Sequence, residues 1–343
     1  MNPEINLQAL QAWLKAQGLD ANHGISIRPI SGGQSNPTYL VDADGVRYVL
    51  RKKPSGALLP GAHAIEREYR VMEALHSTAV PVPRMVGYCD DPSLLGTPFY
   101  VMEFLDGRIM MDQSLPGMTP GERNAIYREM NRLIAALHSA DYTAAGLETF
   151  GKRGNYFERQ IGRWSKQCRA STLPIGPDMR RLMDWLPAHI PSGEQVSLVH
   201  GDYRLDNLVF HPTEPRVIGV LDWELSTLGH PMADFAYHCM SWHIPASLWR
   251  GIGGLDLAAL GIPSESNYVE QYLEQTGRTE GAEHWEFYMA YNLFRMAAIL
   301  HGIAQRAADG NAAASDAEQT GAKAGPLATI GWECALRYAA SRY

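Results

Sequence analysis

The chain has 343 residues, of which 45% are hydrophobic and 20% are charged, a composition typical of a globular protein rather than a disordered one. Its formal net charge of −7 argues against a nucleic-acid-binding protein, which usually presents a basic face. The length is large for a single hydrophobic core, so two packed units or one two-lobed domain are expected. No run of about 18 apolar residues occurs, so no membrane-spanning helix is predicted.

The cysteines and the first residues indicate a cellular compartment. The four cysteines are widely spaced and form no Cys-x-x-Cys pair, which favours reduced thiols over a disulfide framework or a zinc site. The beginning of the chain predicts a short amphipathic helix and lacks the basic and apolar segments of a signal peptide. We therefore expect a cytoplasmic protein that works without a membrane or a nucleic acid. The oligomeric state is left open.

The first part of the chain has the pattern of a small sheet. Asp44–Gly45 is a typical two-residue hairpin turn, and apolar residues at helical spacing predict a helix over 64–75. Short β-rich runs separated by turn residues predict five strands: 24–30, 37–43, 46–52, 80–89 and 97–105.

After residue 105 the pattern changes to helices. Thr119, Pro120 and Glu122 form a capping box with proline at the first helical position, which predicts the start of a long helix. A second long helix is predicted over 284–306, and an Ala- and Gly-rich connector over 307–325 precedes a last helix. The predicted fold class is therefore α+β with two lobes, a five-stranded antiparallel sheet lobe with one helix over 1–105 and a mainly helical lobe over 106–343.

The segment LVHGDYRLDNLVF, residues 198–210, places two carboxylates, an amide and a guanidinium between two apolar β-forming runs. Unpaired buried polar groups cost about 1–3 kcal/mol each, so this loop needs a role that satisfies them. A turn and a second strand follow, and pairing of the two strands would bring Asn207 and Asp222 to the same edge. Amide and carboxylate oxygens suit Mg²⁺, and Asp202 remains available to accept a proton from a hydroxyl group. Phosphoryl transfer needs both groups, ligands for a metal ion and a carboxylate that positions the attacking hydroxyl group.

This loop resembles the catalytic loop of the aminoglycoside phosphotransferase family and its choline-kinase relatives, which have a bilobal protein-kinase-like fold. The sequence HGDYRLDN fits their pattern of His-Gly-Asp with Asn five residues later, and Asp222 of LDWE fits their metal-binding Asp on the next strand. The resemblance extends over nearly the whole chain. Segment 48–75 is also similar to the kinase-like domain that is fused to certain acyl-CoA dehydrogenases.

The resemblance implies a kinase that uses ATP and Mg²⁺ to transfer the γ-phosphoryl group to a hydroxyl group of a small molecule. It implies that Asp202 is the catalytic base, that Asn207 and Asp222 bind magnesium, and that Asp234 supports the catalytic loop. In the first lobe, Glu68 would pair with the cation that binds the phosphates.

Other groups would bind the nucleotide. The backbone around Glu103 and Phe104 would meet the adenine edge. A loop with four candidate residues would cover the phosphates, although a Gly-Gly turn is by itself only a hairpin: Gly32, Gly33, Ser35 and Asn36.

One departure from the family pattern concerns the phosphate-binding cation. Arg51 stands where most of these enzymes have lysine, and it keeps the charge and can bind phosphate bidentately. Lys52 would point to the opposite face of the strand, whereas Lys53 would share the face of Arg51. Either Arg51 or Lys53 could therefore be the cation.

Several residues of the loop have two interpretations. His200 could shuttle a proton, but a structural role in supporting the backbone is favoured. Arg204 could neutralise the transferred phosphoryl group or pair with a nearby carboxylate, and Asp206 is expected to orient the loop. Arg295, between apolar neighbours of a helix, could point into the substrate site or pair with a carboxylate such as Asp234.

The acceptor and the activity also leave alternatives. A hydroxylated acyl compound is favoured over an aminoglycoside, because the C-terminal half shows no dense acidic cluster for a polycation. A non-catalytic, kinase-like nucleotide-binding regulator is the main alternative. A metal-dependent hydrolase that uses His200, Asp202 and Asp206 is a second alternative to the kinase.

Overall fold

The computed structural model describes residues 5–30, 36–56, 64–279, 281–311 and 316–342. The chain forms two compact units, and each is described by itself. The first unit contains Met1–Arg108, Thr143–Leu147 and Asn207–Ser226, and the second contains Ile109–Tyr142, Glu148–Asp206 and Thr227–Tyr343.

The first unit is built on a five-stranded antiparallel sheet in the order β1-β2-β3-β5-β4. Its turn between β2 and β3 is the predicted one, since Asp44 and Gly45 have φ angles of 51° and 82°. Two successive residues of positive φ characterise the hairpin turn that fits the twist of a sheet. The strands are β1 (Ile25–Pro29), β2 (Thr38–Ala43), β3 (Val46–Lys52), β4 (Met85–Cys89) and β5 (Phe99–Glu103).

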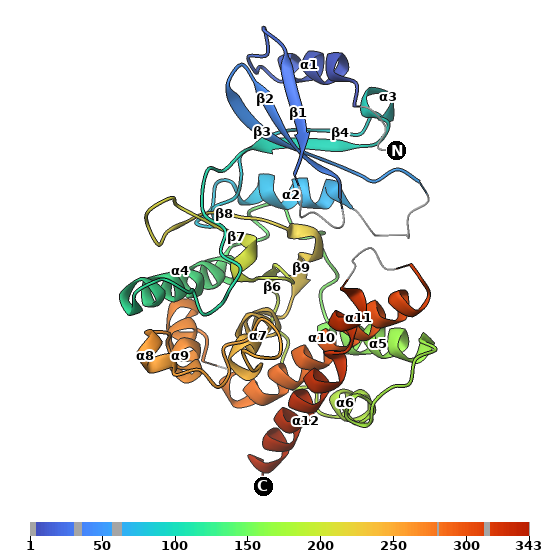
Figure 1. Cartoon of the computed structure of the whole chain (residues 1–343). Helices are drawn as coiled ribbons and strands as arrows, with labels where there is room; N and C mark the ends of the chain where they lie inside the picture. Colours follow the sequence, from blue (N-terminus) through green and yellow to red (C-terminus); the bar gives the residue numbers. More distant parts are fainter. Residues whose placement is uncertain (1–4, 31–35, 57–63, 280, 312–315, 343) are drawn as a thin grey trace. The chain divides into compact units, whose positions relative to one another are not determined.

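Helices cover both faces of this sheet (Figure 1). Helices α1 (Leu7–Ala16) and α3 (Pro92–Leu95) lie on one side, and α2 (Ile65–Leu75) lies on the other. Leu10 and Leu14 of α1 belong to the same buried apolar cluster as strand residues such as Leu50.

Side chains alternate between the two faces along β3, as the strand geometry requires. Lys52 is buried on the face of α3 and donates a hydrogen bond to the carbonyl oxygen of Leu95. Arg51 points to the opposite face and contacts Glu68 of α2. The prediction that Lys52 faces away from Arg51 is confirmed.

The strand–turn–strand that follows the polar loop belongs to the first unit by its contacts. Strands β7 (Leu208–Phe210) and β8 (Val217–Val220) pair as predicted, and a short 3₁₀ helix, η2 (Trp223–Leu225), follows. The sequence pattern predicts that these residues belong to the second lobe. The division into domains at residue 105 stays a prediction.

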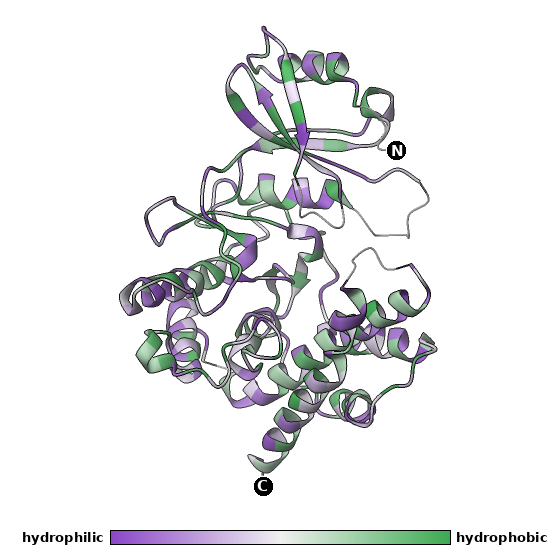
Figure 2. Cartoon of the chain, in the orientation of Figure 1, coloured by the Kyte–Doolittle hydropathy of each residue, from purple (hydrophilic) through white to green (hydrophobic). Residues whose placement is uncertain are grey.

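The second unit is mainly helical, and α7 and α10 are two of its extensively buried helices. In α10, residues 287–298 are all buried, whereas green and purple segments are interleaved along α4 and α12 in Figure 2, as expected for helices that bury one side. Strands β6 (Ser197–Val199) and β9 (Thr227–Gly229) form a short antiparallel pair. The helices are α4 (Pro120–Ser139), α5 (Tyr156–Ala170), α6 (Pro177–Ala188), α7 (Pro231–His243), α8 (Leu257–Leu260), α9 (Glu265–Thr276), η3 (Ala282–His284), α10 (Trp285–Ala308), α11 (Ala317–Gly321) and α12 (Ala324–Ala340).

The predicted fold class, an α+β fold with an N-terminal five-stranded antiparallel sheet and a mainly helical C-terminal part, is confirmed. One local prediction was incomplete, because the connector over 307–325 contains the short helix α11. Its two buried residues are Ala317 and Gly321, too small to give an apolar pattern in the sequence. Among the described residues, no helix is both long and apolar enough to cross a membrane.

The cap of α4 provides a test of local stability. Thr119 accepts a hydrogen bond from the backbone N–H of Glu122, and the Glu122 carboxylate accepts one from the backbone N–H of Thr119. We expect Thr119→Ala to lower the free energy of unfolding by about 1 kcal/mol, because it removes one half of this box. Urea titration followed by circular dichroism measures the change. Thr119→Ser keeps the cap and should stay near the wild type, and equal stability of all three proteins would contradict the prediction.

Candidate active site

An ion-pair cluster in the first unit surrounds Arg51. The Nε atom of Arg51 lies 3.1 Å from Oε2 of Glu68, and Nη2 lies 3.5 Å from Oδ1 of Asp222 and 3.9 Å from Oε2 of Glu224. The Glu68 side chain is 1% exposed, whereas those of Asp222 and Glu224 are 34% and 29% exposed. One guanidinium therefore joins a buried carboxylate to two that solvent and ligands can reach. We call these four residues the Arg51 cluster.

Glu68 is held from both of its oxygens. The hydroxyl of Tyr100 donates to Oε2 and the side-chain amide of Asn36 donates to Oε1, both at 3.0 Å. Burial raises the pKa of the Glu68 carboxyl to about 7, although the charge of Arg51 and the bond from Tyr100 act in the opposite direction. The predicted pairing of the helix glutamate with a cation on the third strand is thus present, and that cation is Arg51.

The shape of the guanidinium explains why arginine suits this position. Its Nε and Nη2 atoms point in different directions and contact Glu68 and Asp222 at once. The ammonium of lysine is a single point of charge on a flexible stem and lacks this fixed fork. Arginine in place of lysine at residue 51 therefore keeps the positive charge and allows a second fixed contact, the one with Asp222.

The edge of the β7–β8 hairpin brings Asn207 and Asp222 together as predicted. Leu208 is paired with Val220, and the backbone N–H of Leu221 donates to the carbonyl oxygen of Asn207 at 2.9 Å. Asp222 has a φ of 64°, a left-handed conformation that is uncommon for a residue other than glycine. Strained backbone of this kind gathers at functional sites.

This pair fits a magnesium ion by its chemistry. Asn207 and Asp222 offer an amide oxygen and carboxylate oxygens, the hard donors that Mg²⁺ takes, and the ion usually keeps several waters or phosphate oxygens as further ligands. Among the described residues, no group of three or more His, Cys, Asp and Glu side chains could hold a metal by itself. The donor set therefore suits an ion that arrives with a phosphate compound.

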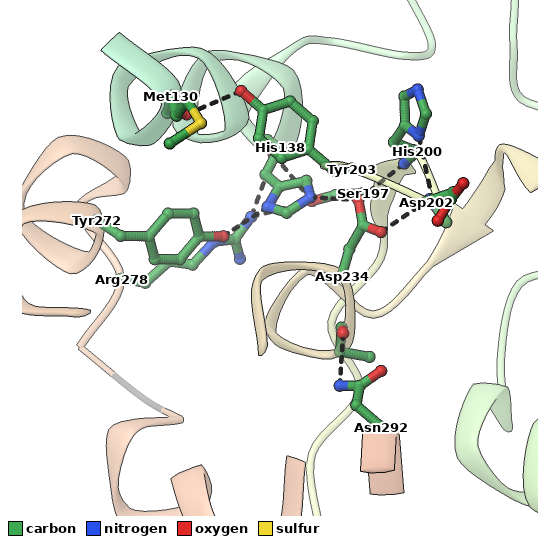
Figure 3. A network of polar contacts seen from close by, with 12 residues as sticks. Met130, His138, Ser197, His200, Asp202, Tyr203, Asp234, Tyr272, Arg278 and Asn292 are labelled. Carbon is green, nitrogen blue, oxygen red and sulfur yellow. Dashed lines mark hydrogen bonds and ion pairs between the residues drawn. The ribbon is translucent and has the colours of Figure 1, made fainter. Parts of the chain in front are cut away.

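In the second unit, one buried carboxylate holds the polar loop (Figure 3). Asp234 lies in the first turn of α7 and accepts from the backbone N–H of His200 and of Gly201, both at 2.8 Å. His138 of α4 lies 3.1 Å from the same carboxylate. Burial by itself would raise the pKa of Asp234, but the bonds from His138 and His200 outweigh it and lower the pKa. The carboxylate is thus charged and has bonded donors around it.

A second layer fixes His138. Its Nδ1 atom lies 2.7 Å from the hydroxyl of Tyr272, and its carbonyl oxygen accepts from Ser197 and Arg278 (Figure 3). Burial lowers the pKa of His138, which favours the neutral ring. With the proton on Nε2, the neutral ring donates to Asp234 and accepts from Tyr272. The loop is therefore anchored to α4, α7 and α9.

Asp202 is oriented by three side chains. Tyr237 of α7 donates its hydroxyl to Oδ1, and Arg204 donates from Nη2 to Oδ2 at 3.1 Å. Arg295 of α10 donates to the carbonyl oxygen of Gly201 at 2.8 Å, and its guanidinium lies 4.9 Å from the ring centre of Tyr237. The side chain of Asp202 is 17% exposed, so the carboxylate is fixed and still reachable.

The geometry bears on the loop residues that had two interpretations. His200 is fully buried and its Nδ1 accepts from the backbone N–H of Asp202 at 3.2 Å, an arrangement that favours the structural role. Arg204 contacts Asp202 and also lies 3.5 Å from Asp206, which favours pairing with carboxylates. Arg295 bonds the loop backbone rather than the carboxylate of Asp234.

The structure describes only some of the residues that are predicted to bind the nucleotide. Gly32, Gly33 and Ser35 lie outside the described residues, whereas Asn36 bonds Glu68. The backbone N–H groups of Glu103 and Phe104 donate to the carbonyl oxygens of Arg84 and Arg47. An adenine edge would therefore need other groups of this segment.

Sequence reasoning missed four residues: Tyr100 and Glu224, which contribute to or support the Arg51 cluster of the first unit, and His138 and Tyr237, which support the polar loop of the second. Tyr100 and Tyr237 are apolar-looking members of buried elements, so periodicity only predicts that they are buried. His138 ends a predicted helix with no ligand spacing. Only Glu224 could have been identified from the local sequence, because it is a second carboxylate two residues after Asp222 in LDWE.

Comparison with known proteins reveals a family. The model of the phosphotransferase enzyme family matches residues 26–291. Acyl-CoA dehydrogenase family member 10 of Mus musculus is 46% identical over 96% of this chain and 31% of its own length. Acyl-CoA dehydrogenase family member 11 of Homo sapiens is 39% identical over 96% of this chain and 43% of its own length. The chain spans less than half the length of these curated relatives.

Solved structures agree with this result. A Ralstonia eutropha protein, provisionally named an aminoglycoside phosphotransferase, is 54% identical with a TM-score of 0.90 over 97% of this chain and 99% of that one. Macrolide 2'-phosphotransferase MphH of Brachybacterium faecium is 20% identical with a TM-score of 0.59 over 93% and 98% of the two chains, which shows a shared fold. The resemblance inferred from the sequence is confirmed, including that to members of the acyl-CoA dehydrogenase family.

Glu68 gives a pH-dependent prediction. Its pKa of about 7 in the folded state is above its ordinary value of 4.5, so the folded state binds the proton more tightly than the unfolded state. The stabilisation from this group is complete below pH 4.5 and is lost as the pH rises to about 7. Relative to Glu68→Gln, the wild type should therefore lose up to about 1.4 kcal/mol of unfolding free energy per pH unit in this interval.

Urea unfolding of both proteins across this range measures the difference. The glutamine variant keeps the size and an amide that can bond Tyr100 and Asn36, so its other losses do not depend on pH. A difference that stays constant with pH would show that Glu68 titrates in its ordinary range.

Proposed function

Because this chain belongs to the phosphotransferase enzyme family, we propose that it transfers the terminal phosphoryl group of ATP to an alcohol group of a small molecule. The predicted enzyme class, a phosphotransferase with an alcohol group as acceptor, agrees with this membership. The single observation that carries the proposal is the fixed loop from His200 to Asn207. It holds one reachable carboxylate on a backbone anchored by Asp234.

Asp202 is the proposed catalytic base. The acceptor oxygen forms a bond to the γ-phosphorus as the bond from that phosphorus to the bridging oxygen of ATP breaks, and the hydroxyl proton passes to Asp202. Tyr237 donates to Oδ1 of this carboxylate and Arg204 contacts both of its oxygens, so its orientation is set before the acceptor binds. Arg204 also adds positive charge near the reacting group.

Asn207 and Asp222 are the proposed magnesium ligands. When bound, the ion would neutralise negative charge on the phosphates. Their adjacency at the hairpin edge and the strained backbone of Asp222 support this assignment. Arg51, fixed by Glu68, is the proposed cation for the phosphates. Structures of the same fold include a GDP complex and a complex with AMP-PNP and hygromycin B, which supports a nucleotide as donor.

The proposed acceptor is a hydroxylated acyl compound. The curated relatives are acyl-CoA dehydrogenases, and a kinase part on such proteins would act on a related acyl substrate. The aminoglycoside and macrolide enzymes among the solved structures share the fold at low identity, which says nothing of the acceptor here.

Removal of the base is the direct test. We expect Asp202→Ala to lower kcat by a factor of about a hundred or more, the usual contribution of a general base, with little change in the KM for Mg·ATP. Release of ADP is measured across hydroxyacyl thioesters, amino alcohols, sugars and aminoglycosides. The control is Asp256→Ala, which alters a cap of α8.

Two results would contradict parts of this proposal. Full activity of Asp202→Ala would refute the base assignment. If ATP raises the melting temperature of the wild type but no acceptor in the panel is ever phosphorylated, the chain is a nucleotide-binding regulator with a kinase-like fold.

The fork of Arg51 gives a second prediction. Arg51→Lys keeps the charge but cannot contact Glu68 and Asp222 at once, so we expect the KM for Mg·ATP to rise by about tenfold, the loss of one charge-assisted contact. The acceptor KM should change far less. Arg47→Lys, on the same strand but paired with the exposed Asp106, is the matched control. Equal nucleotide KM values for Arg51→Lys and the wild type would show that the fork is not needed.

A further inference from the structure

A small cavity in the second unit adjoins the loop of Asp202. It has a volume of about 40 Å³, and Arg204 and Asp206 of the loop contribute to its wall. Tyr237, which bonds Asp202, contributes as well. The cavity is thus lined in part by groups that set the position of the proposed base.

The rest of the wall is mainly apolar and unusually rich in methionine. These residues come from the segment before α4, from α7 and the loop after it, and from α10: Met111, Met240, Ile244, Trp249 and Met296. Methionine side chains are flexible and polarisable, so a wall of them adapts to aliphatic groups of different length. A small cavity of this kind can enlarge when a chain enters.

Two polar atoms in the wall have no hydrogen-bond partner among the residues that the structure describes. The hydroxyl of Ser241 and the side-chain amide oxygen of Gln113 are buried and make no hydrogen bond within the part of the chain that the structure describes. Ser241 is 6% exposed and lies inside α7, where a serine could bond a carbonyl of the preceding turn. Buried polar groups are almost always bonded, so two orphans in one small cavity point to a missing partner.

The charge at this wall rejects a polycation. Asp206 is the one acidic residue among the lining residues, and Arg250 lies 3.0 Å and Arg204 3.5 Å from the same oxygen of it. Arg250 holds a left-handed backbone with a φ of 49°. A carboxylate already shared by two guanidinium groups offers little to an aminoglycoside.

We propose that this cavity is a subsite for the aliphatic part of the acceptor, and that a hydroxyl group of the acceptor there donates a hydrogen bond to the amide oxygen of Gln113 and accepts one from the hydroxyl of Ser241. The inference rests on the proposed kinase function and gives the acceptor a class, an aliphatic hydroxy compound. The methionine wall contacts the chain, and the orphan atoms gain the partner that they lack. Small-molecule sites usually combine apolar side chains with polar groups that fix the orientation of the ligand.

The first test varies the acceptor and the cavity. With hydroxyacyl thioesters from butanoyl to decanoyl, kcat/KM of the wild type should rise about fourfold for each of the first added methylenes and then level off. Ser241→Ala should lower kcat/KM by about fivefold, the loss of one hydrogen bond. Ser241→Leu fills the cavity and should raise the acceptor KM by about tenfold or more with little change in the KM for Mg·ATP.

Ser165 provides matched controls. Its hydroxyl is also buried and without a partner among the described residues, but it lies on α5 and does not line the cavity. Ser165→Ala and Ser165→Leu should leave acceptor kinetics near the wild type. If the Ser241 variants behave like the Ser165 variants, the cavity holds a water molecule only and the proposal is wrong.

A second measurement separates this inference from the proposed function. Octanediol and glycerol are titrated calorimetrically into the enzyme without nucleotide, because binding needs no phosphoryl transfer. Tighter binding of octanediol that Ser241→Leu abolishes would support the subsite even if no acceptor is phosphorylated. Equal binding of the two alcohols would overturn the subsite even if the enzyme proves to be a kinase.

Discussion

The buried carboxylate of Asp234 is the constraint on which the polar loop depends. It sits in the first turn of α7, where two backbone N–H groups of the loop and one ring of α4 converge on it. The hydrogen bonds from the backbone N–H groups to this charged carboxylate are strong, because hydrogen bonds to ionised groups are about twice as strong as those between neutral groups. Gly201 makes the turn possible, since its φ of 84° is readily reached only without a side chain. The position of Asp202 follows from these bonds.

The supports around Asp202 form a hierarchy. Asp234 fixes the backbone, Arg295 fixes the carbonyl of Gly201, and Tyr237 then orients the carboxylate itself. Burial raises the pKa of Tyr237 well above its ordinary value, so it remains a phenol and donates. Groups from α7 and α10 therefore prepare one side chain before any ligand binds, which is the kind of preorganisation that catalysis requires.

In the Arg51 cluster, one cation compensates the charge of several carboxylates. A single guanidinium compensates a carboxylate that is almost fully buried and two that are partly exposed. Tyr100 and Asn36 donate hydrogen bonds to the oxygens of Glu68, so the Arg51 side chain is held from the interior while its Nη2 atom contacts the partly exposed carboxylates of Asp222 and Glu224. An isolated buried ion pair costs desolvation energy, and hydrogen bonds to the remaining oxygens reduce this cost.

The sequence by itself determined the local features of this protein. The Asp44–Gly45 turn, the cap at Thr119 and the β7–β8 pairing each depend on residues a few positions apart, so spacing and propensity were sufficient. The adjacency of Asn207 and Asp222 followed from that pairing. The family pattern in HGDYRLDN then supplied the roles, which periodicity could not.

Tertiary structure decided the contacts between distant segments. It selected Arg51 as the partner of Glu68, and it brought Tyr237 to Asp202. It also left the hydroxyl of Ser241 with no hydrogen-bond partner among the described residues, beside the methionine wall. The physical reason is that a buried polar side chain is recognised by what surrounds it, and those neighbours come from helices and strands that the chain order does not place. Sequence patterns predict that such a residue is buried, whereas only the packed structure shows whether its hydrogen bonds are made.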